Sequence, residues 1–210
     1  MKLVPTPLAG CFVIEDQFFG DERGYFFESF NQKTFEAATG QSVNFVQDNQ
    51  SMSKRGVLRG LHFQQHEHAQ AKLVRVLQGS VLDVVVDIRK GSATYGQTFS
   101  IELTESNHKQ LFVPRGFAHG FLVTSETAVF FYKVDNYYNK ASEQGIMYND
   151  PQLAIDWGMD AAEFLLSEKD QQLPYLQAIE PQEVYICKEL FLPVDPVPDC
   201  IPSPRELVSS

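Results

Sequence analysis

The sequence predicts an all-β domain, an antiparallel sandwich or barrel with a few short peripheral helices. Between residues 11 and 134, short apolar runs recur at roughly even spacing and are separated by turns that contain Gly or Pro. This pattern is typical of β-sandwiches and β-barrels. The run from Val81 to Ile88 alternates between two faces, as a half-buried strand does. No part of the chain alternates strands with long helices, so a doubly wound parallel sheet is not expected.

The individual elements follow in chain order, each predicted from an apolar or aromatic run that ends at a turn signal. We expect a first strand at residues 11–14, then a turn at residues 20–24 and an aromatic strand that continues to Phe30. A short surface helix over residues 31–39 ends at Gly40. Further strands are expected at residues 45–53, 57–64, 72–78, 81–88, 98–103, 111–113, 117–123 and 128–134, and short helical turns within residues 160–178.

Length and composition indicate one globular unit followed by a tail. The 210 residues, of which 43% are hydrophobic, suffice for a single domain with a substantial core. Five of the eleven prolines follow Leu192, a composition that favours an extended strap over a helix. We therefore expect one domain at residues 1–185 and a proline-rich C-terminal tail at residues 186–210.

Charge and cysteine content narrow the partners and the compartment. The net charge of −10 disfavours nucleic acid and anionic membranes as partners, although a pocket with a few cations can still bind a small anion. Cys11, Cys187 and Cys200 show no paired spacing, which predicts free thiols in a reducing compartment. The sequence has no apolar leader and no run of about 18 apolar residues. We expect a cytoplasmic protein.

Cations interrupt the predicted strands at residues 57–64 and 72–78. Arg59, His62 and Lys72 stand among apolar residues, where an unpaired charge costs free energy. Cations in such positions predict a pocket for an anionic ligand. Strict alternation places Arg59 and His62 on opposite faces, so a common pocket requires a bulge, which Gly60 between them permits.

The spacing of the histidines is similar to that of metal-binding cupin barrels. Such barrels carry His-x-His, then a glutamate, and later Pro-x-Gly-x-x-His. This chain has His66 and His68, but it has Lys72 where the carboxylate belongs, and its second motif ends at His119. Because a protonated ammonium is not a metal ligand, no metal is expected, and His66 and His68 are interpreted as loop residues. A metal-dependent cupin that uses His66, His68 and His119 stays an alternative.

Ordered motifs extend over roughly residues 10–172. They include Gly20-Asp21-x-Arg23-Gly24-x-Phe26-Phe27-Glu28, Gln47-Asp48-Asn49-x-Ser51, Gly56-Val57-Leu58-Arg59-Gly60-Leu61-His62-Phe63-Gln64, Gly116-Phe117-Ala118-His119-Gly120-Phe121, Tyr132-Lys133 and Leu166-Ser167-Glu168-Lys169-Asp170. Together they resemble the dTDP-4-dehydrorhamnose 3,5-epimerase family. The resemblance implies a cupin-type jelly roll, usually a homodimer, that works without a metal or an organic cofactor.

The same resemblance implies an isomerase whose substrate is a 4-keto-6-deoxyhexose linked to dTDP. Its hydrogens at C3 and C5 adjoin the C4 ketone, so a base can remove each of them if the enolate is stabilised. The expected reaction converts dTDP-4-dehydro-6-deoxy-D-glucose to dTDP-4-dehydro-L-rhamnose, on the path to dTDP-L-rhamnose. Two alternatives stay open, an epimerase of one carbon only and a non-catalytic module that binds sugar nucleotides.

Residue roles are carried over from the resemblance at the matching positions. His62 is the expected base, Asp170 orients its ring, Lys72 stabilises the enolate, and Tyr132 returns a proton from the opposite face. Arg23 and Arg59 suit the diphosphate, because a guanidinium binds phosphate oxygens in pairs. The full set of expected substrate-binding residues is Arg23, Glu28, Gln47, Asp48, Asn49, Arg59, His119, Tyr138, Glu143 and Lys169.

Overall fold

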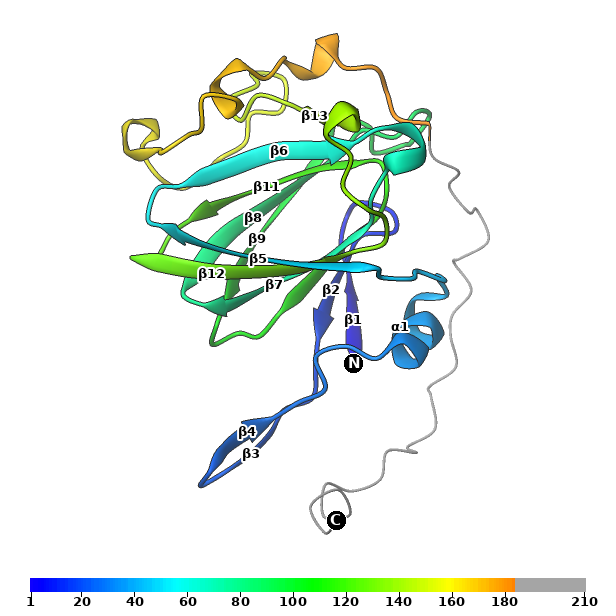
Figure 1. Cartoon of the computed structure of the whole chain (residues 1–210), viewed down its shortest axis with the longest axis vertical. Helices are drawn as coiled ribbons and strands as arrows, with labels where there is room; N and C mark the ends of the chain where they lie inside the picture. The colour runs from blue at the N-terminus through cyan, green and yellow to red at the C-terminus, as the bar shows by residue number, and fades with distance from the viewer. Residues whose placement is uncertain (184–210) are drawn as a thin grey trace.

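Two antiparallel β-sheets face each other in the computed structural model, which describes residues 1–183 (Figure 1). One sheet has the strand order β1 (Lys2–Pro5), β2 (Phe12–Glu15), β10 (Gln110–Val113), β7 (Lys72–Gln78), β12 (Thr127–Val134) and β5 (Gln47–Lys54). The other has the order β13 (Glu143–Gly145), β6 (Leu58–Gln64), β11 (Phe117–Val123), β8 (Ser80–Asp87) and β9 (Thr98–Thr104). From β5 to β13 the chain changes sheet at every step except β8–β9, the connectivity of a jelly roll. The predicted all-β fold is confirmed.

Most strands lie where the apolar alternation places them. The strands predicted at residues 72–78 and 117–123 coincide with β7 and β11, and the other predicted strands of the two sheets differ by one or two residues at an end. The aromatic strand predicted to reach Phe30 is wrong beyond Phe26. There β4 (Gly24–Phe26), whose only partner is β3 (Phe19–Asp21), ends. Phe27 stacks on Phe18 instead of extending the hairpin.

The space between the sheets holds the largest apolar cluster. Val81 and Val85 of β8 point into it beside Phe121 and Phe130, whose rings stack at a centroid distance of 4.1 Å. Each such side chain stabilises the fold by about 1.5–3 kcal/mol when it is fully buried. Phe121 and Phe130 of this cluster also line the cavity that lies between the sheets.

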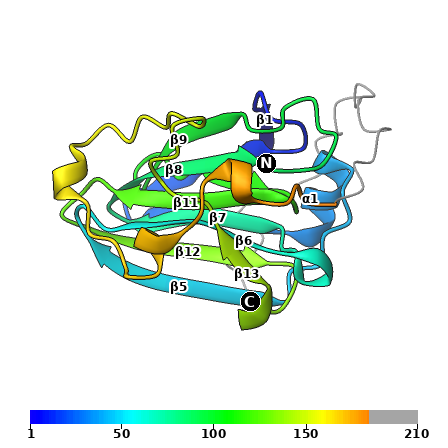
Figure 2. The same ribbon diagram turned by 90° about the horizontal axis from the view of Figure 1, so that it is seen from above.

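The outer face of the five-stranded sheet is covered by the segment from residue 146 to residue 179 (Figures 1 and 2). Val84 and Val86 of β8 pack there against Leu153, Trp157 and Leu176. Both faces of β8 are therefore buried, which explains why its apolar residues do not alternate with exposed ones. The predicted helical turns of this segment are the short 3₁₀ turns η3 (Ala161–Glu163), η4 (Asp170–Gln172) and η5 (Leu176–Ala178).

Two peripheral elements flank the six-stranded sheet. The predicted helix is confirmed as α1 (Gln32–Thr39), with the Asn31 side chain accepting a hydrogen bond from the Thr34 amide and Gly40 in the left-handed region at φ 66°. The β3–β4 hairpin projects away from the sheets (Figure 1). No helix within residues 1–183 has the length and apolar character needed to cross a bilayer.

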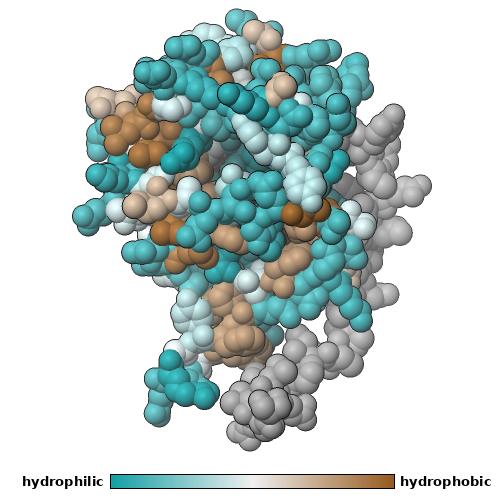
Figure 3. Space-filling model, viewed as in Figure 1, coloured by the Kyte–Doolittle hydropathy of each residue, from teal (hydrophilic) through white to brown (hydrophobic). Residues whose placement is uncertain are grey.

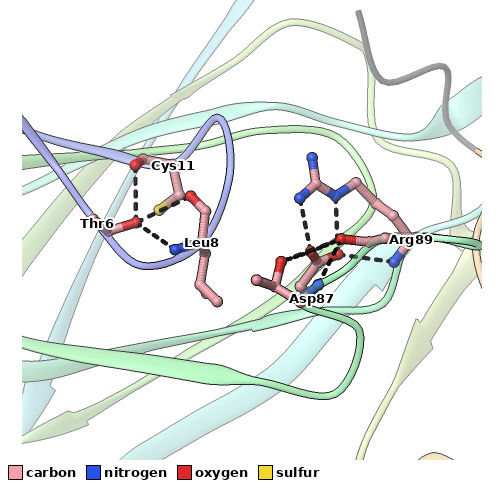
Figure 4. A network of polar contacts seen from close by, with 7 residues as sticks. Thr6, Leu8, Cys11, Asp87 and Arg89 are labelled. Carbon is pink, nitrogen blue, oxygen red and sulfur yellow. Dashed lines mark hydrogen bonds and ion pairs between the residues drawn. The ribbon is translucent and has the colours of Figure 1, made fainter. Parts of the chain in front are cut away.

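Buried polar groups tie loops to the strands (Figure 4). The Asp87 carboxylate accepts hydrogen bonds from Arg89, Ser92 and Thr94. Cys11 is a buried free thiol, and burial raises its pKa to about 12, which makes it unreactive at neutral pH. Cys187, Cys200, the expected boundary at residue 185 and the tail at residues 186–210 lie outside the described residues.

Candidate active site

A cavity of about 630 Å³ opens between the two sheets. Its walls come from β5, β7 and β12 of one sheet, from β6, β11 and β13 of the other, and from residues 165–170, which cover it. The stacked rings of Phe121 and Phe130 form an apolar part of the wall. The predicted site residues that line the cavity are Asn49, Arg59, His62, Lys72, His119, Tyr132, Glu143, Lys169 and Asp170.

A bulge brings Arg59 and His62 to the same cavity, as the sequence required. His62 pairs with His119 across β6 and β11, but Arg59 pairs with Phe121, so β6 has one more residue in this interval than β11. Gly60 lies in the bulge at φ +124°, and a Cβ there would be 2.6 Å from the Cα of Gly120. Only glycine fits this close approach of two backbones.

His62 and Asp170 form a close pair at the cavity wall. The Nε2 atom of His62 lies 2.6 Å from Oδ1 of Asp170, and the two side chains are 27% and 5% exposed. Burial acts to raise the pKa of Asp170, but the hydrogen bond and the charge of His62 hold it below its ordinary value. Since an ionised carboxylate only accepts, Nε2 carries the hydrogen and Nδ1 is left to take up a proton. The pair has the geometry of an oriented general base.

Lys72 and Tyr132 stand on the sheet that faces His62. Burial lowers the pKa of the Lys72 ammonium to about 8, while the charges of Asp83 and Glu143 act against this fall. Burial raises the pKa of the Tyr132 phenol, so its hydroxyl keeps its proton at neutral pH. Because β12 and β6 belong to opposite sheets, the phenol and the imidazole border the cavity from opposite sides.

The mouth of the cavity carries further charge. Arg59 donates hydrogen bonds to the Ser53 hydroxyl at 3.1 and 3.2 Å and makes no ion pair within residues 1–183. Glu143 pairs with Lys169 at 2.5 Å and accepts a hydrogen bond from the Tyr138 hydroxyl at 2.8 Å. The guanidinium of Arg59 is therefore available to an anion, whereas the ammonium of Lys169 is neutralised by Glu143.

A second histidine–aspartate pair lies deeper, and sequence reasoning assigned no role to its carboxylate. Nε2 of His119 lies 2.9 and 3.0 Å from the two carboxylate oxygens of Asp83, which is fully buried on β8. The alternation of residues 81–88 placed Asp83 on the face opposite Leu82, Val84 and Val86, which in a half-buried strand is the exposed one. Its burial follows from the second sheet and so gave no signal in the sequence.

The remaining predicted binding residues do not line the cavity. Gln47 donates a hydrogen bond to Asn49 at 2.9 Å, and Asp48 pairs with Lys133 at 3.0 Å. Tyr138 reaches the cavity only through Glu143. Arg23, at the turn of the β3–β4 hairpin, is exposed and pairs with Asp21, and Glu28 accepts a hydrogen bond from Asn31 beside α1.

The histidines of the metal hypothesis are not brought together. His119 lines the cavity and is bound to Asp83, whereas His66 and His68 lie in the turn η1 (His66–His68) outside it. The Nε2 atom of His68 is 2.9 Å from the Asn139 amide. In the described part of the chain, no three His, Cys, Asp or Glu side chains converge as metal ligands.

Comparison with known proteins gives a consistent picture. A family model described as dTDP-4-dehydrorhamnose 3,5-epimerase matches residues 5–178. The dTDP-4-dehydrorhamnose 3,5-epimerase of Salmonella typhimurium is 51% identical over 176 residues, which cover 84% of this chain and 96% of the relative. The crystal structure of the same enzyme from Elizabethkingia anophelis is 56% identical with a TM-score of 0.82, covering 84% of this chain and 97% of that one. The epimerase of Legionella pneumophila in complex with dTDP-4-keto-L-rhamnose is 46% identical with a TM-score of 0.84, covering 88% and 98%.

Proposed function

The chain belongs to the dTDP-4-dehydrorhamnose 3,5-epimerase family, and from this membership we infer that it converts dTDP-4-dehydro-6-deoxy-D-glucose to dTDP-4-dehydro-L-rhamnose. One observation gives this reaction its strongest support. A histidine oriented by a carboxylate and a tyrosine that keeps its proton border one cavity from opposite sides. This is the arrangement that inversion at a carbon next to a ketone requires, since the proton leaves on one face and returns on the other.

Proton removal is the task of His62. Its Nδ1 takes the hydrogen from C3 or C5, and the C–H electron pair moves into the C4 carbonyl to form an enolate. Asp170 stabilises the imidazolium that results, since its carboxylate is ionised and lies 2.6 Å from Nε2. Without that carboxylate the ring loses both its orientation and the compensation of its new charge.

Lys72 stabilises the enolate oxygen. With a pKa of about 8, its ammonium is largely protonated at pH 7 and stands inside a cavity where charge interactions are weakly screened. Tyr132 then donates its phenolic proton to the carbon from the side opposite His62. The net change at each carbon is an inversion with no electron gained or lost, so the reaction needs no redox cofactor, and Lys72 supplies the positive charge at the enolate oxygen.

The diphosphate is bound by Arg59 at the mouth of the cavity, where the guanidinium has no ionic partner within the described chain. The protein as a whole carries a net charge of −10, so attraction of an anionic substrate depends on this local group of cations. Asn49, which lines the same wall and is held by Gln47, offers its amide to the sugar or the base.

We propose further that the protein is a homodimer in which the β3–β4 hairpin docks on a second copy. Tyr25 and Phe26 of this hairpin are 64% and 61% exposed, and a two-stranded hairpin is marginally stable in water by itself. In Figure 3 hydrophobic side chains gather above the hydrophilic tip of the projection. Docking would carry Arg23 from the hairpin turn to the cavity of the second copy, where its guanidinium could bind the diphosphate.

Incubation with dTDP-4-dehydro-6-deoxy-D-glucose in deuterated water tests the reaction. We expect deuterium at both C3 and C5 of the product, detected by NMR. Label at C3 alone would show a single-carbon epimerase and contradict the proposal.

The homodimer is tested by light scattering, which gives the mass of the particle in solution. Arg23→Ala should raise KM with little change in kcat. A monomer that turns over normally contradicts the docking of the hairpin.

A further inference from the structure

Two carboxylates are fully buried on β8, and only one of them has a structural explanation. Asp87 accepts hydrogen bonds from Arg89, Ser92 and Thr94 and so anchors a loop. Asp83 lies four residues earlier on the same face of the strand. Within residues 1–183 its carboxylate is hydrogen-bonded by the His119 ring alone. A buried carboxylate with one donor costs free energy, so stability does not account for it.

The contact with Asp83 determines which nitrogen of His119 faces a ligand. Both carboxylate oxygens lie within 3.0 Å of Nε2, so Nε2 carries a hydrogen and is occupied. Nδ1 is then the ring nitrogen left to the substrate. His119 lines the cavity directly and is the cross-strand partner of His62, whereas Asp83 stands behind it and does not line the cavity.

Asp83 also acts on Lys72. It is the larger of the two negative charges that oppose the effect of burial on the Lys72 ammonium, the other being Glu143. Glu143 is neutralised by Lys169 at 2.5 Å, which leaves Asp83 as the principal compensating charge. The ionisable groups around the cavity are Arg59 and His62 of β6, His119 of β11, Tyr132 of β12, Glu143 of β13, and Lys169 and Asp170 of the covering segment.

We propose that Asp83 is a positioning residue of this site, which holds the His119 ring in one orientation and keeps Lys72 in the ammonium form that stabilises the enolate. The proposal rests on the proposed epimerase function. Asp83 is then a buried charge that affects the orientation of His119 and the protonation of Lys72 without contacting the substrate.

Asp83→Asn separates the two effects, because the amide keeps an acceptor for His119 and the side-chain volume but loses the charge. Activity requires protonated Lys72, so kcat falls as the pH rises through a pKa of about 8 in the wild type. Loss of a nearby opposite charge lowers that pKa, so the alkaline limb of the kcat profile moves down by about one pH unit. We expect a severalfold lower kcat at pH 7.5 and an unchanged KM, whereas Asp83→Ala also raises KM because the His119 ring is released.

Asp87→Asn is the matched control, since it makes the same change at a buried carboxylate of the same strand. It should lower the melting temperature and leave the alkaline limb in place. The proposal is overturned if Asp83→Asn leaves the limb unmoved, or if Asp87→Asn moves it equally.

Two further measurements cover the two ways in which these experiments could fail: the first needs no Asp83 variant, and the second needs no turnover of the substrate. In Lys72→Arg the cation is charged at every accessible pH, so the limb should disappear from whatever activity remains; a limb that persists contradicts the assignment to Lys72. NMR titration of the Lys72 side chain, without substrate, should show a pKa lower in Asp83→Asn than in the wild type. Equal values overturn the proposal, whereas an inactive wild type with unequal values overturns only the epimerase function.

Discussion

Two histidine–aspartate pairs border one cavity, and they differ in exposure and in how each carboxylate is held. The side chain of His62 is 27% exposed and that of His119 is 7% exposed. Asp170 comes from the covering segment, 108 residues from His62 in sequence, whereas Asp83 belongs to the strand next to that of His119.

This difference in exposure suits the two histidine–aspartate pairs to two tasks, proton removal at His62 and ligand binding at His119. The partly exposed imidazole of His62 can exchange the proton it takes up with water, as a base must between turnovers. The buried imidazole of His119, which is held by both carboxylate oxygens of Asp83 on β8, is suited to a hydrogen bond of fixed direction.

The largest effect is expected at His62. His62→Ala should abolish proton exchange at both C3 and C5 and lower kcat by about 10²–10⁴-fold, since a general base contributes that much. His119→Ala should retain exchange and mainly raise KM. Deuterium incorporation followed by NMR distinguishes them, and equal loss of exchange in both variants would end the distinction between the pairs.

Tyr132 acts together with His62 in the proposed reaction, since His62 removes the proton and Tyr132 returns one. Loss of the Tyr132 hydroxyl should therefore separate hydrogen exchange with solvent from inversion of the carbon. In Tyr132→Phe the base is intact, so hydrogen at C3 and C5 still exchanges with solvent, while formation of the L-sugar falls by about 10²-fold or more. Product configuration and deuterium content are measured in the same sample. Equal loss of inversion and exchange argues against Tyr132 as the acid on the opposite face.

The bulge at Gly60 affects the positions of both histidines, because it lies two residues before His62 on β6 and packs against His119 and Gly120 of β11. Gly60→Ala places a Cβ 2.6 Å from the Cα of Gly120 and 2.8 Å from the carbonyl oxygen of His119. We expect a loss of about 1–3 kcal/mol in the free energy of unfolding, measured by denaturant titration. Gly91→Ala is the control, because Gly91 also has positive φ (+72°) but no atom within 4 Å of such a Cβ. An equal loss in both variants would trace the effect to backbone strain and not to the bulge.

The smallest effect concerns acid stability. The folded-state pKa of Asp170 is lowered by His62 despite burial, so the pair contributes stability above the ordinary carboxyl pKa of about 4. That contribution disappears as the pH falls through the lowered pKa. Melting temperatures from pH 6 to pH 2 should therefore fall more steeply in the wild type than in Asp170→Asn. Parallel curves would show that the pair does not stabilise the fold.

Much of the fold was predictable because its determinants are local. The apolar alternation of β7 and β11 is contained in each strand, and α1 carries its own cap residues Asn31 and Gly40. The short strands β1 and β13 were not predicted, since three or four residues hold too little pattern and depend on a partner strand. The aromatic run after β4 was misjudged for the same reason, because strand propensity cannot show where a hairpin loses its partner.

The sequence by itself determined the kinds of groups at the site, a lysine in place of a metal-binding carboxylate and two cations beside a glycine that permits a bulge. Only the tertiary structure decided which side chains lie close enough to interact. The family resemblance implied that Asp170 orients His62, and the structure places the two side chains 2.6 Å apart across 108 residues. The structure alone paired His119 with Asp83, and it left Arg23 and Asp48 outside the cavity. Side-chain chemistry belongs to the residue, but the distance between two charges, and with it their pKa values, exists only after the strands have paired.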